Sequence, residues 1–174
     1  MAEDSGPRDD DVQGTPWLTA AQRPAWLSMV RMMTVLPARL GAQLERDAEL
    51  NFFEYHVLAM LSETAERSLR MSRLAGLTSS SLSRLSNVVK RLEGRGLVRR
   101  ERDPDDGRAT RAVLTDAGVA LVEAVAPIHV AAVRDLVVDA LSPAELEQVR
   151  IANQKILARL DPAAETRPEW IREG

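Results

Sequence analysis

Short polar and cationic side chains gather on one face of a segment that the sequence predicts to be helical, residues 78–96. Hydroxyl, amide and cationic groups can meet base edges and phosphate oxygens, and they lack the bulk that would hold a helix out of a DNA groove. A solvated helix face more often carries Glu and Lys, whereas the first acidic residue here is Glu93. The spacing predicts a DNA-binding face that comprises Ser79, Ser80, Ser81, Ser83, Arg84, Asn87, Lys90 and Arg91.

The opposite face of the same segment is apolar. Its leucines and valines recur at steps of three and four, which places them on one stripe of a helix that faces a core. Thr78 or Ser79 is the expected N-cap, and Gly94 and Gly96 supply stop signals at the other end. A shorter supporting helix is expected just before it, over residues 71–76. The predicted stripe comprises Leu82, Leu85, Val88, Val89 and Leu92.

A short basic hairpin follows the helix. Residues 97–102 (LVRRER) and 111–114 (RAVL) are predicted to form two strands. The DPDDG stretch between them has turn chemistry, because Pro presets φ and Asp-Gly tolerates positive φ. Two helices and a basic hairpin make a winged helix-turn-helix, predicted over residues 51–115. Its wing is expected to extend the DNA-binding set with Arg102, Arg108 and Arg111.

Charge is distributed unevenly along the chain. The whole sequence has 23 Lys and Arg against 26 Asp and Glu, a net charge of −3, which by itself argues against a nucleic-acid partner. Residues 67–111, however, hold 12 of the basic residues and only 5 of the acidic ones. This segregation favours docking of one cationic surface on a phosphate backbone in a single orientation.

Four short motifs resemble those of the MarR family of transcriptional regulators. They are Leu74-Ala75, RLEGRGLV at 91–98, DDGR at 105–108 and LTDAG at 114–118. The resemblance spans about residues 19–160 and is strongest between 71 and 118. It implies that Arg108, in the Asp-x-Arg motif of the wing, reaches into the minor groove. Gly107 stands where the family often has a long basic residue, so a weaker grip of the wing tip is expected.

Further helices are expected on both sides of this domain. One should run over residues 19–50 with a kink at Pro37, which breaks the hydrogen-bond ladder, and another over 52–66. After the wing, a helix capped by Thr115 should extend to about residue 141. The Ser-Pro-Ala-Glu run that follows is a capping box, which begins a last helix ending near residue 160.

The predicted architecture is mainly α with a small β-wing, a winged helix-turn-helix plus long terminal dimerisation helices. The dimerisation helices, residues 17–50 and 116–160, carry more apolar surface than a small winged helix can cover, and a second copy would bury it. The resemblance implies the same, because in the family the terminal helices of two subunits interlock. A monomer with these helices folded back is the alternative. An acidic tail at 1–16, expected to be disordered, and a tail at 161–174 complete the chain.

These observations predict a homodimeric, sequence-specific regulator, a repressor, that binds a palindromic operator in double-stranded DNA. The resemblance further implies release by a small aromatic or phenolic effector, bound between the dimer helices and the winged helix. The predicted ligand-binding residues are Trp26, Arg31, His56 and Met60. They could supply a ring face, a cation, a polar group and an adaptable wall, in that order. Helix-core packing explains Trp26 and Met60 equally well.

Two other classes of function stay open. A winged helix can be a protein-interaction module without DNA binding, although such a surface more often exposes aromatic or aliphatic anchors than serine and asparagine. An enzyme that acts on a small molecule would need a catalytic constellation. Glu54 and His56 point apart on a helix and cannot form a dyad, and no phosphate loop, nucleophile elbow or metal-ligand spacing is found. The prediction is therefore a protein that is not an enzyme and needs no cofactor.

Composition narrows the remaining possibilities. The absence of cysteine excludes disulfides and thiolate metal sites, and with only His56 and His129 no zinc site is expected. No apolar run approaches the roughly 20 residues of a membrane span. The N-terminus is acidic instead of basic and then apolar, so a cytoplasmic location on the nucleoid is predicted.

Overall fold

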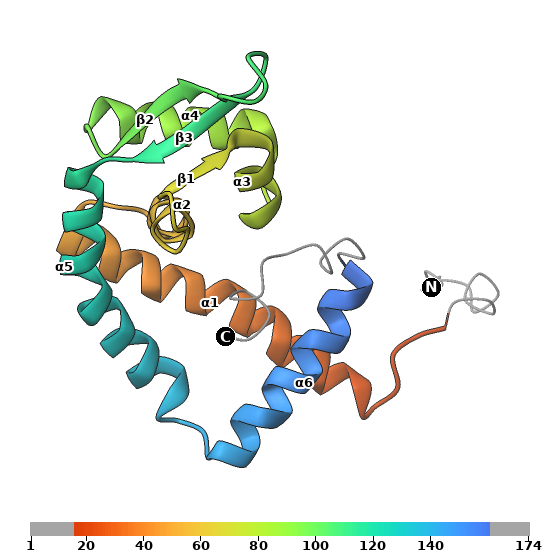
Figure 1. Ribbon diagram of the computed structural model, residues 1–174. Coiled ribbons are helices and arrows are strands. Elements are labelled where there is room, and N and C mark those ends of the chain that lie inside the picture. Colours follow the sequence, from red (N-terminus) through yellow and green to blue (C-terminus); the bar gives the residue numbers. More distant parts are fainter. Residues whose placement is uncertain (1–15, 161–174) are drawn as a thin grey trace, which may run out of the picture. The chain divides into compact units, whose positions relative to one another are not determined.

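The computed structural model describes residues 16–160 (Figure 1). The two predicted tails lie outside the described residues, apart from the exposed Pro16. The chain divides into two compact units, and the boundary falls between Leu36 and Pro37. It lies inside the long helix α1, Gln22–Ala48, which continues through Pro37. Pro37 has no N–H to donate, so one rung of the helical ladder is missing at the place where the two units meet in sequence.

The first unit contains the N-terminal half of α1. Thr19 and Gln22 form a reciprocal cap, in which the Thr19 N–H donates to Gln22 Oε1 (3.0 Å) and the Gln22 N–H donates to Thr19 Oγ1 (3.2 Å). This cap agrees with the predicted helix start at Thr19. The apolar side chains of this half are exposed, among them Trp26, Leu27, Val30, Met32, Met33 and Val35.

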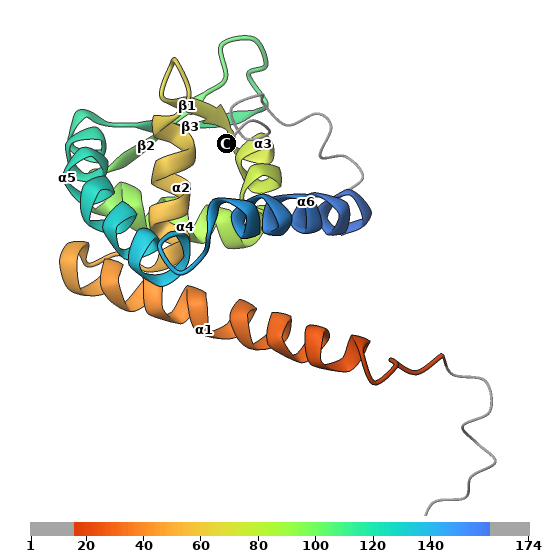
Figure 2. The same ribbon diagram turned by 90° about the horizontal axis from the view of Figure 1, so that it is seen from below.

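After the C-terminal half of α1, the second unit contains a winged helix-turn-helix. Its elements are α2 (Phe52–Ser62), β1 (Ser68–Arg70), α3 (Met71–Leu77), α4 (Leu82–Gly94), β2 (Val98–Arg102) and β3 (Thr110–Leu114). The three strands form an antiparallel sheet in the order β1-β3-β2. Ala112 of the central strand lies opposite Leu69 of β1 on one side and opposite Arg100 of β2 on the other. Helices α2, α3 and α4 pack against each other and against this sheet (Figure 2). This arrangement confirms the predicted fold class.

The core of this domain lies between the three helices and the sheet. Leu58 of α2, Leu74 of α3, Leu85 and Leu92 of α4 and Val98 of β2 are almost completely buried. The apolar stripe predicted on α4 is confirmed at four of its five positions. Leu82 is the exception, because as the first residue of α4 it precedes the turn that contacts the core, and it is 52% exposed.

Several element boundaries differ from those predicted. Strand β1 was not expected, because three residues are too few for an alternating pattern to be recognised. Helix α2 ends at Ser62 instead of residue 66. The N-cap of α4 is Ser81, not Thr78 or Ser79: the Ser81 hydroxyl accepts from the Arg84 N–H (3.2 Å). Thr78 instead closes α3 by donating to the Leu74 carbonyl (2.8 Å).

Two helical segments and a π-helical turn follow the wing. Thr115 caps α5 (Asp116–Val133) as predicted, accepting from the Gly118 N–H (3.1 Å). The expected continuation to residue 141 is instead a π-helix, η2 (Arg134–Val138). The predicted capping box opens α6 (Pro143–Leu160), where the Ser142 N–H donates to Glu145 Oε2 (2.8 Å). Apolar side chains stay exposed on these elements, including Ile128, Val130, Leu136, Val149, Ile151 and Leu157.

Candidate nucleic-acid interface

The centre of the polar face of α4 is open to solvent. Ser83, Asn87 and Lys90 are all exposed. The side chains of Asn87 and Lys90 have no hydrogen-bond or ion-pair partner among residues 16–160, and the Ser83 hydroxyl pairs only with that of Ser81 (3.2 Å). An exposed amide without a partner can offer both a donor and an acceptor to a base edge. The packing of Leu85 and Leu92 on the opposite face fixes which way this set points.

The serines before α4 shape the turn between the two helices. Ser79 is exposed and has a left-handed φ of 48°. Ser80 is half-buried, and its hydroxyl lies 3.0 Å from that of Thr78. Ser81 caps α4, so its hydroxyl is already engaged with the backbone. Among the four predicted serines, Ser79 and Ser83 present the most open side chains.

The predicted cations on the flank of α4 have partners within the protein. The guanidinium carbon of Arg84 lies 4.5 Å from the centroid of the Phe53 ring. Arg91 Nε donates to Glu54 Oε1 (2.9 Å). Sequence reasoning did not single out Arg95, whose two terminal nitrogens donate to the carbonyls of Glu49 (2.7 Å) and Ala48 (3.2 Å). These partners are far away in the sequence, so no local pattern signals them.

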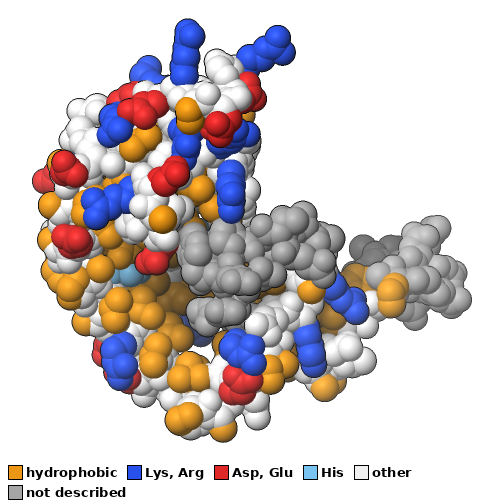
Figure 3. Space-filling view, viewed as in Figure 1, with side chains coloured by type: hydrophobic (Ala, Val, Ile, Leu, Met, Phe, Trp, Pro, Cys, Tyr) orange, Lys and Arg blue, Asp and Glu red, His pale blue; other side chains and the backbone are white. Residues whose placement is uncertain are grey.

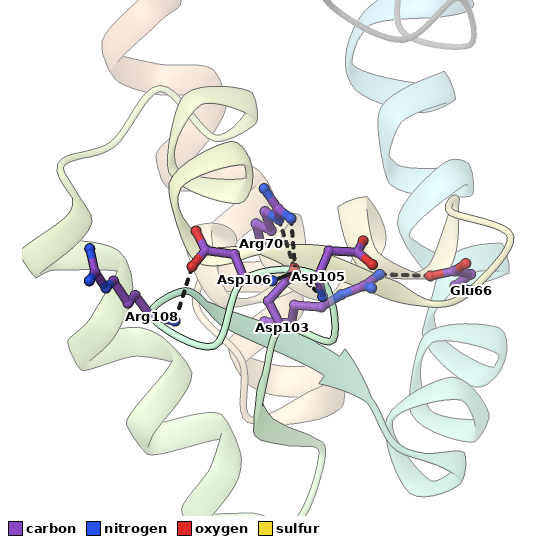
Figure 4. Close-up of polar contacts among 7 residues, drawn as sticks. Glu66, Arg70, Asp103, Asp105, Asp106 and Arg108 are labelled. Atoms are coloured by element: carbon purple, nitrogen blue, oxygen red, sulfur yellow. Dashed lines mark hydrogen bonds and ion pairs between the residues drawn. The ribbon is translucent and has the colours of Figure 1, made fainter.

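The wing presents two free arginines. Arg102 and Arg108 are exposed, and their guanidinium groups have no partner among residues 16–160. Arg108 projects away from the acidic cluster at the wing base (Figure 4), and only its backbone N–H is engaged, donating to Asp106 Oδ1 (3.1 Å). Basic side chains protrude over the hairpin in the space-filling view (Figure 3). Arg111 differs, because it is largely buried and paired with Glu66 (2.7 Å).

Ion pairing reduces the free positive charge of the segment 67–111. Five of its twelve basic residues pair with carboxylates: Arg70, Arg91, Arg99, Arg100 and Arg111. The other seven cations of this segment have no acidic partner among residues 16–160: Arg67, Arg73, Arg84, Lys90, Arg95, Arg102 and Arg108. Arg67 and Arg73 were not named as site residues, although both contribute to the cationic charge count of this segment.

A buried carboxylate anchors the wing to the rest of the domain. Asp103 is 3% exposed and receives a bidentate pair from Arg70, with Nε–Oδ2 and Nη2–Oδ1 distances of 2.7 and 2.8 Å (Figure 4). Its Oδ1 also accepts the N–H groups of Asp105 and Asp106, both at 3.1 Å. The hydrogen bonds from Arg70 hold the pKa of Asp103 below its usual range. The turn that presents Arg108 is therefore tied to β1.

Acid should weaken this anchor. The pKa of Asp103 is lower in the folded protein than in the unfolded chain, where an aspartate has a pKa of about 3.9. The ionised carboxylate therefore contributes its full stabilisation above that value. This stabilisation is lost as the pH falls through the folded-state pKa. We expect Asp103→Asn to lower the thermal unfolding midpoint most at neutral pH, and the difference from the wild type to shrink below about pH 4. Calorimetry across this range tests it, and a difference that stays constant with pH would contradict the ionised anchor.

The residues predicted to bind an effector fall in both units. Trp26 and Arg31 are exposed on the part of α1 that belongs to the first unit, whereas His56 and Met60 are half-buried on α2 in the second. The ring of His56 lies 6.5 Å from that of Phe52. His129, the other histidine, lies against Tyr55 with a centroid distance of 4.6 Å, and its Nδ1 lies 3.1 Å from Gln43 Oε1. Burial lowers the pKa of His129, which favours its neutral form.

Residues 16–160 contain neither a candidate metal cluster nor a helix that could span a membrane. No group of three or more His, Asp or Glu side chains is placed to hold a metal ion. None of the helices combines the length and the apolar character needed to cross a membrane.

Known proteins resemble this chain in sequence and in structure. The model of the MarR family matches residues 50–110. Sco3205, a MarR family transcriptional regulator from Streptomyces coelicolor solved in complex with DNA, has 40% sequence identity and a TM-score of 0.81, over 83% of this chain and 94% of its own. AbsC, a MarR family regulator from the same organism, has 37% identity and a TM-score of 0.82, over 85% and 99%.

A third structure is less similar in sequence. Sco5413, also a MarR family regulator from Streptomyces coelicolor, has 26% identity and a TM-score of 0.68, over 84% of this chain and 97% of its own. None of the curated proteins matches the chain.

Proposed function

Because the chain belongs to the MarR family of DNA-binding transcriptional regulators, we propose that it is a sequence-specific, homodimeric repressor. The polar face of α4 enters the major groove, and the wing places Arg108 in the adjacent minor groove. Two features of the same domain carry this proposal. The exposed Asn87 at the centre of α4 has no partner among residues 16–160, and neither do Arg102 and Arg108 on the wing. Base edges are read by such amides, while cations meet phosphates and the minor groove.

The proposed DNA-binding residues divide into two groups. Ser79, Asn87, Lys90, Arg102 and Arg108 have exposed side chains without a partner among residues 16–160, and the exposed Ser83 hydroxyl pairs only with that of Ser81. The others, Ser80, Ser81, Arg84, Arg91 and Arg111, have partners within the protein, so a contact with DNA would have to share or replace them. Electrophoresis with genomic fragments tests the function: retardation of a small subset of fragments at moderate salt is expected, and no retarded fragment would contradict it.

A non-enzymatic role in the cytoplasm, on the nucleoid, completes the proposal. DNA binding by α4 and the wing needs no cofactor. A winged helix that binds only proteins is the alternative, and on α4 the exposed Leu82 favours it. One leucine among serines, asparagine and lysine is a poor anchor for a protein partner, since such interfaces are centred on several aromatic or aliphatic side chains.

We expect the protein to be a dimer at micromolar concentration. The helices outside the winged domain expose large apolar side chains, and a monomer would leave them in water. Residues 17–50 and 116–160 are the proposed dimerisation segments. Sedimentation equilibrium should give a species of twice the 19.2 kDa chain mass. A single species at the chain mass that persists as concentration rises would rule out this assembly.

A small aromatic or phenolic effector is proposed to release the repressor from DNA. Trp26, Arg31, His56 and Met60 remain the proposed ligand-binding residues, because they offer a ring face, a cation, a polar group and an apolar wall. Salicylate can serve as the probe: it should lower operator affinity of the wild type, and Arg31→Ala should weaken that effect. An equal response of the two proteins would remove Arg31 from the site.

A further inference from the structure

Three arginines on one flank of α4 are bound to residues 48–54, the corner where α1 ends and α2 begins. Arg84, Arg91 and Arg95 are spaced by seven and four residues, which places them on a single side of the helix. We propose that these three are positioning residues, which hold the recognition helix α4 at a fixed angle on the corner. For Arg84 and Arg91 this role replaces the direct DNA contact considered above. This inference rests on the proposed DNA-binding function.

The best-connected contact is that of Arg91. Its Nε donates to Glu54 Oε1 (2.9 Å), and the Glu54 side chain is only 11% exposed. The second carboxylate oxygen of Glu54 accepts the N–H of Asn51 (3.0 Å), and the Asn51 side chain accepts the N–H of Glu54 (2.9 Å). The Glu54 carboxylate is thus part of the capping box that begins α2, and it also binds Arg91. A carboxylate shared in this way links the start of α2 to the middle of α4.

Arg95 makes the equivalent contact with the end of α1. Its terminal nitrogens donate to the carbonyls of Glu49 (2.7 Å) and Ala48 (3.2 Å). The last carbonyls of a helix have no intrahelical partner, and a cation there also interacts favourably with the helix dipole. Glu49 leaves the helix with a φ of 54°, so the chain turns sharply at this point. Arg95 therefore supplies two hydrogen-bond donors to the carbonyl groups of this turn.

Arg84 completes the flank at the N-terminal end of α4. Its guanidinium lies over the half-buried ring of Phe53 at 4.5 Å from the centroid, within the range of a cation–π contact. The three contacts differ in chemistry: a ring face, a carboxylate and two carbonyls. Together they occupy one side of α4, while Asn87 and Lys90 occupy the neighbouring side that faces solvent.

The consequence concerns how the two recognition helices are spaced in a dimer. α1 is one of the proposed dimerisation helices, and its last turn is joined to α4 through Arg95. A substitution in the corner would therefore alter the orientation of α4 without removing a cation that contacts the DNA. Loss of a positioning residue should lower operator affinity and leave the salt dependence unchanged, because no counterion-releasing contact is lost.

Glu54→Gln gives the sharpest test. Glutamine also serves at this position of a capping box, so the variant should fold, and a thermal unfolding curve checks this. Removal of a negative charge near a polyanion should by electrostatics alone raise affinity. We expect the reverse for the operator: its affinity falls about tenfold, the equivalent of 1.4 kcal/mol, while affinity for random DNA does not fall. A rise, or no change, in operator affinity would overturn the proposal.

Arg95→Ala and Lys90→Ala form a matched pair on the same helix. Lys90 has no partner in the described residues, so its loss should reduce the slope of log affinity against log salt by about 0.9 per lost phosphate contact. Arg95→Ala should weaken operator binding with an unchanged slope, and an equal loss of slope in both variants would contradict the positioning role. A wild type without preference for any operator would instead refute the DNA-binding function itself, so the two failures can be told apart.

Discussion

Asn87→Ala is expected to lower the affinity for the operator by about 1–3 kcal/mol and to leave affinity for random DNA almost unchanged. Asn87 lies at the centre of the exposed face of α4, and its amide has no partner within the described chain. Its energetic contribution should therefore arise only when a particular base pair is opposite. Fluorescence anisotropy with operator and random duplexes at the same salt concentration gives the ratio directly.

Arg108→Ala is the matched control for this experiment. Arg108 is exposed on the wing, and its charge acts through phosphates and the minor-groove potential. Its loss should weaken both kinds of DNA and reduce the salt slope by about 0.9 for each lost phosphate contact. A constant ratio of operator to random affinity in a folded, dimeric Asn87→Ala protein, and also in Ser83→Ala, would exclude the proposed reading face.

Gly118→Ala is expected to destabilise the protein by about 3 kcal/mol, at the upper end of what overpacking usually costs. A Cβ at this position would lie 2.2 Å from the Leu97 carbonyl oxygen and 2.7 Å from Leu114 Cδ1. The same carbonyl accepts the Thr115 N–H (3.1 Å), so movement to relieve the clash would also disturb the start of α5. The close approach of α5 to the β2 end of the sheet explains why glycine is needed here.

Gly76→Ala provides the comparison. Gly76 lies inside α3, and a Cβ there would meet no atom within 4 Å. Alanine should therefore be neutral or stabilise by up to about 1 kcal/mol, from the difference in helix propensity. Urea unfolding at one fixed protein concentration measures both variants, since the stability of a dimer depends on concentration. If Gly118→Ala proved as stable as Gly76→Ala, the packing of α5 against Leu97 and Leu114 would be wrong.

The sequence was most informative where a clear repeat of apolar residues was followed by residues that end a helix or form a turn. Leucine and valine recur at steps of three and four in α4 and are followed by two glycines and the DPDDG turn, which was enough to predict this helix and the wing. The N-cap of α4 was predicted at Thr78 or Ser79, and this was wrong, because all four residues from Thr78 to Ser81 are possible caps by type. Each has a hydroxyl that can cap, and only the backbone conformation selects Ser81.

The partners of the arginines could not be predicted. Arg70 pairs with a residue 33 positions away and Arg91 with one 37 positions away, and local patterns hold no record of such contacts. As a result the residue types predicted a DNA-binding face on α4, but they did not distinguish exposed cations from those engaged within the protein. Asp103 illustrates the same limit, because a turn aspartate and a buried anchor have the same appearance in sequence.

Footprinting of an operator selected from genomic fragments tests the central claim most directly. Fragments retained by the wild-type protein are sequenced, and the shared site is then probed for protection from cleavage. A dimer with two α4 helices should protect an imperfect palindrome whose half-site centres lie about one helical turn, roughly 10 bp, apart, with further protection in the flanking minor grooves. Protection of a single short asymmetric site, or no enriched fragment at all, would contradict a two-fold symmetric repressor that reads DNA through α4 and the wing.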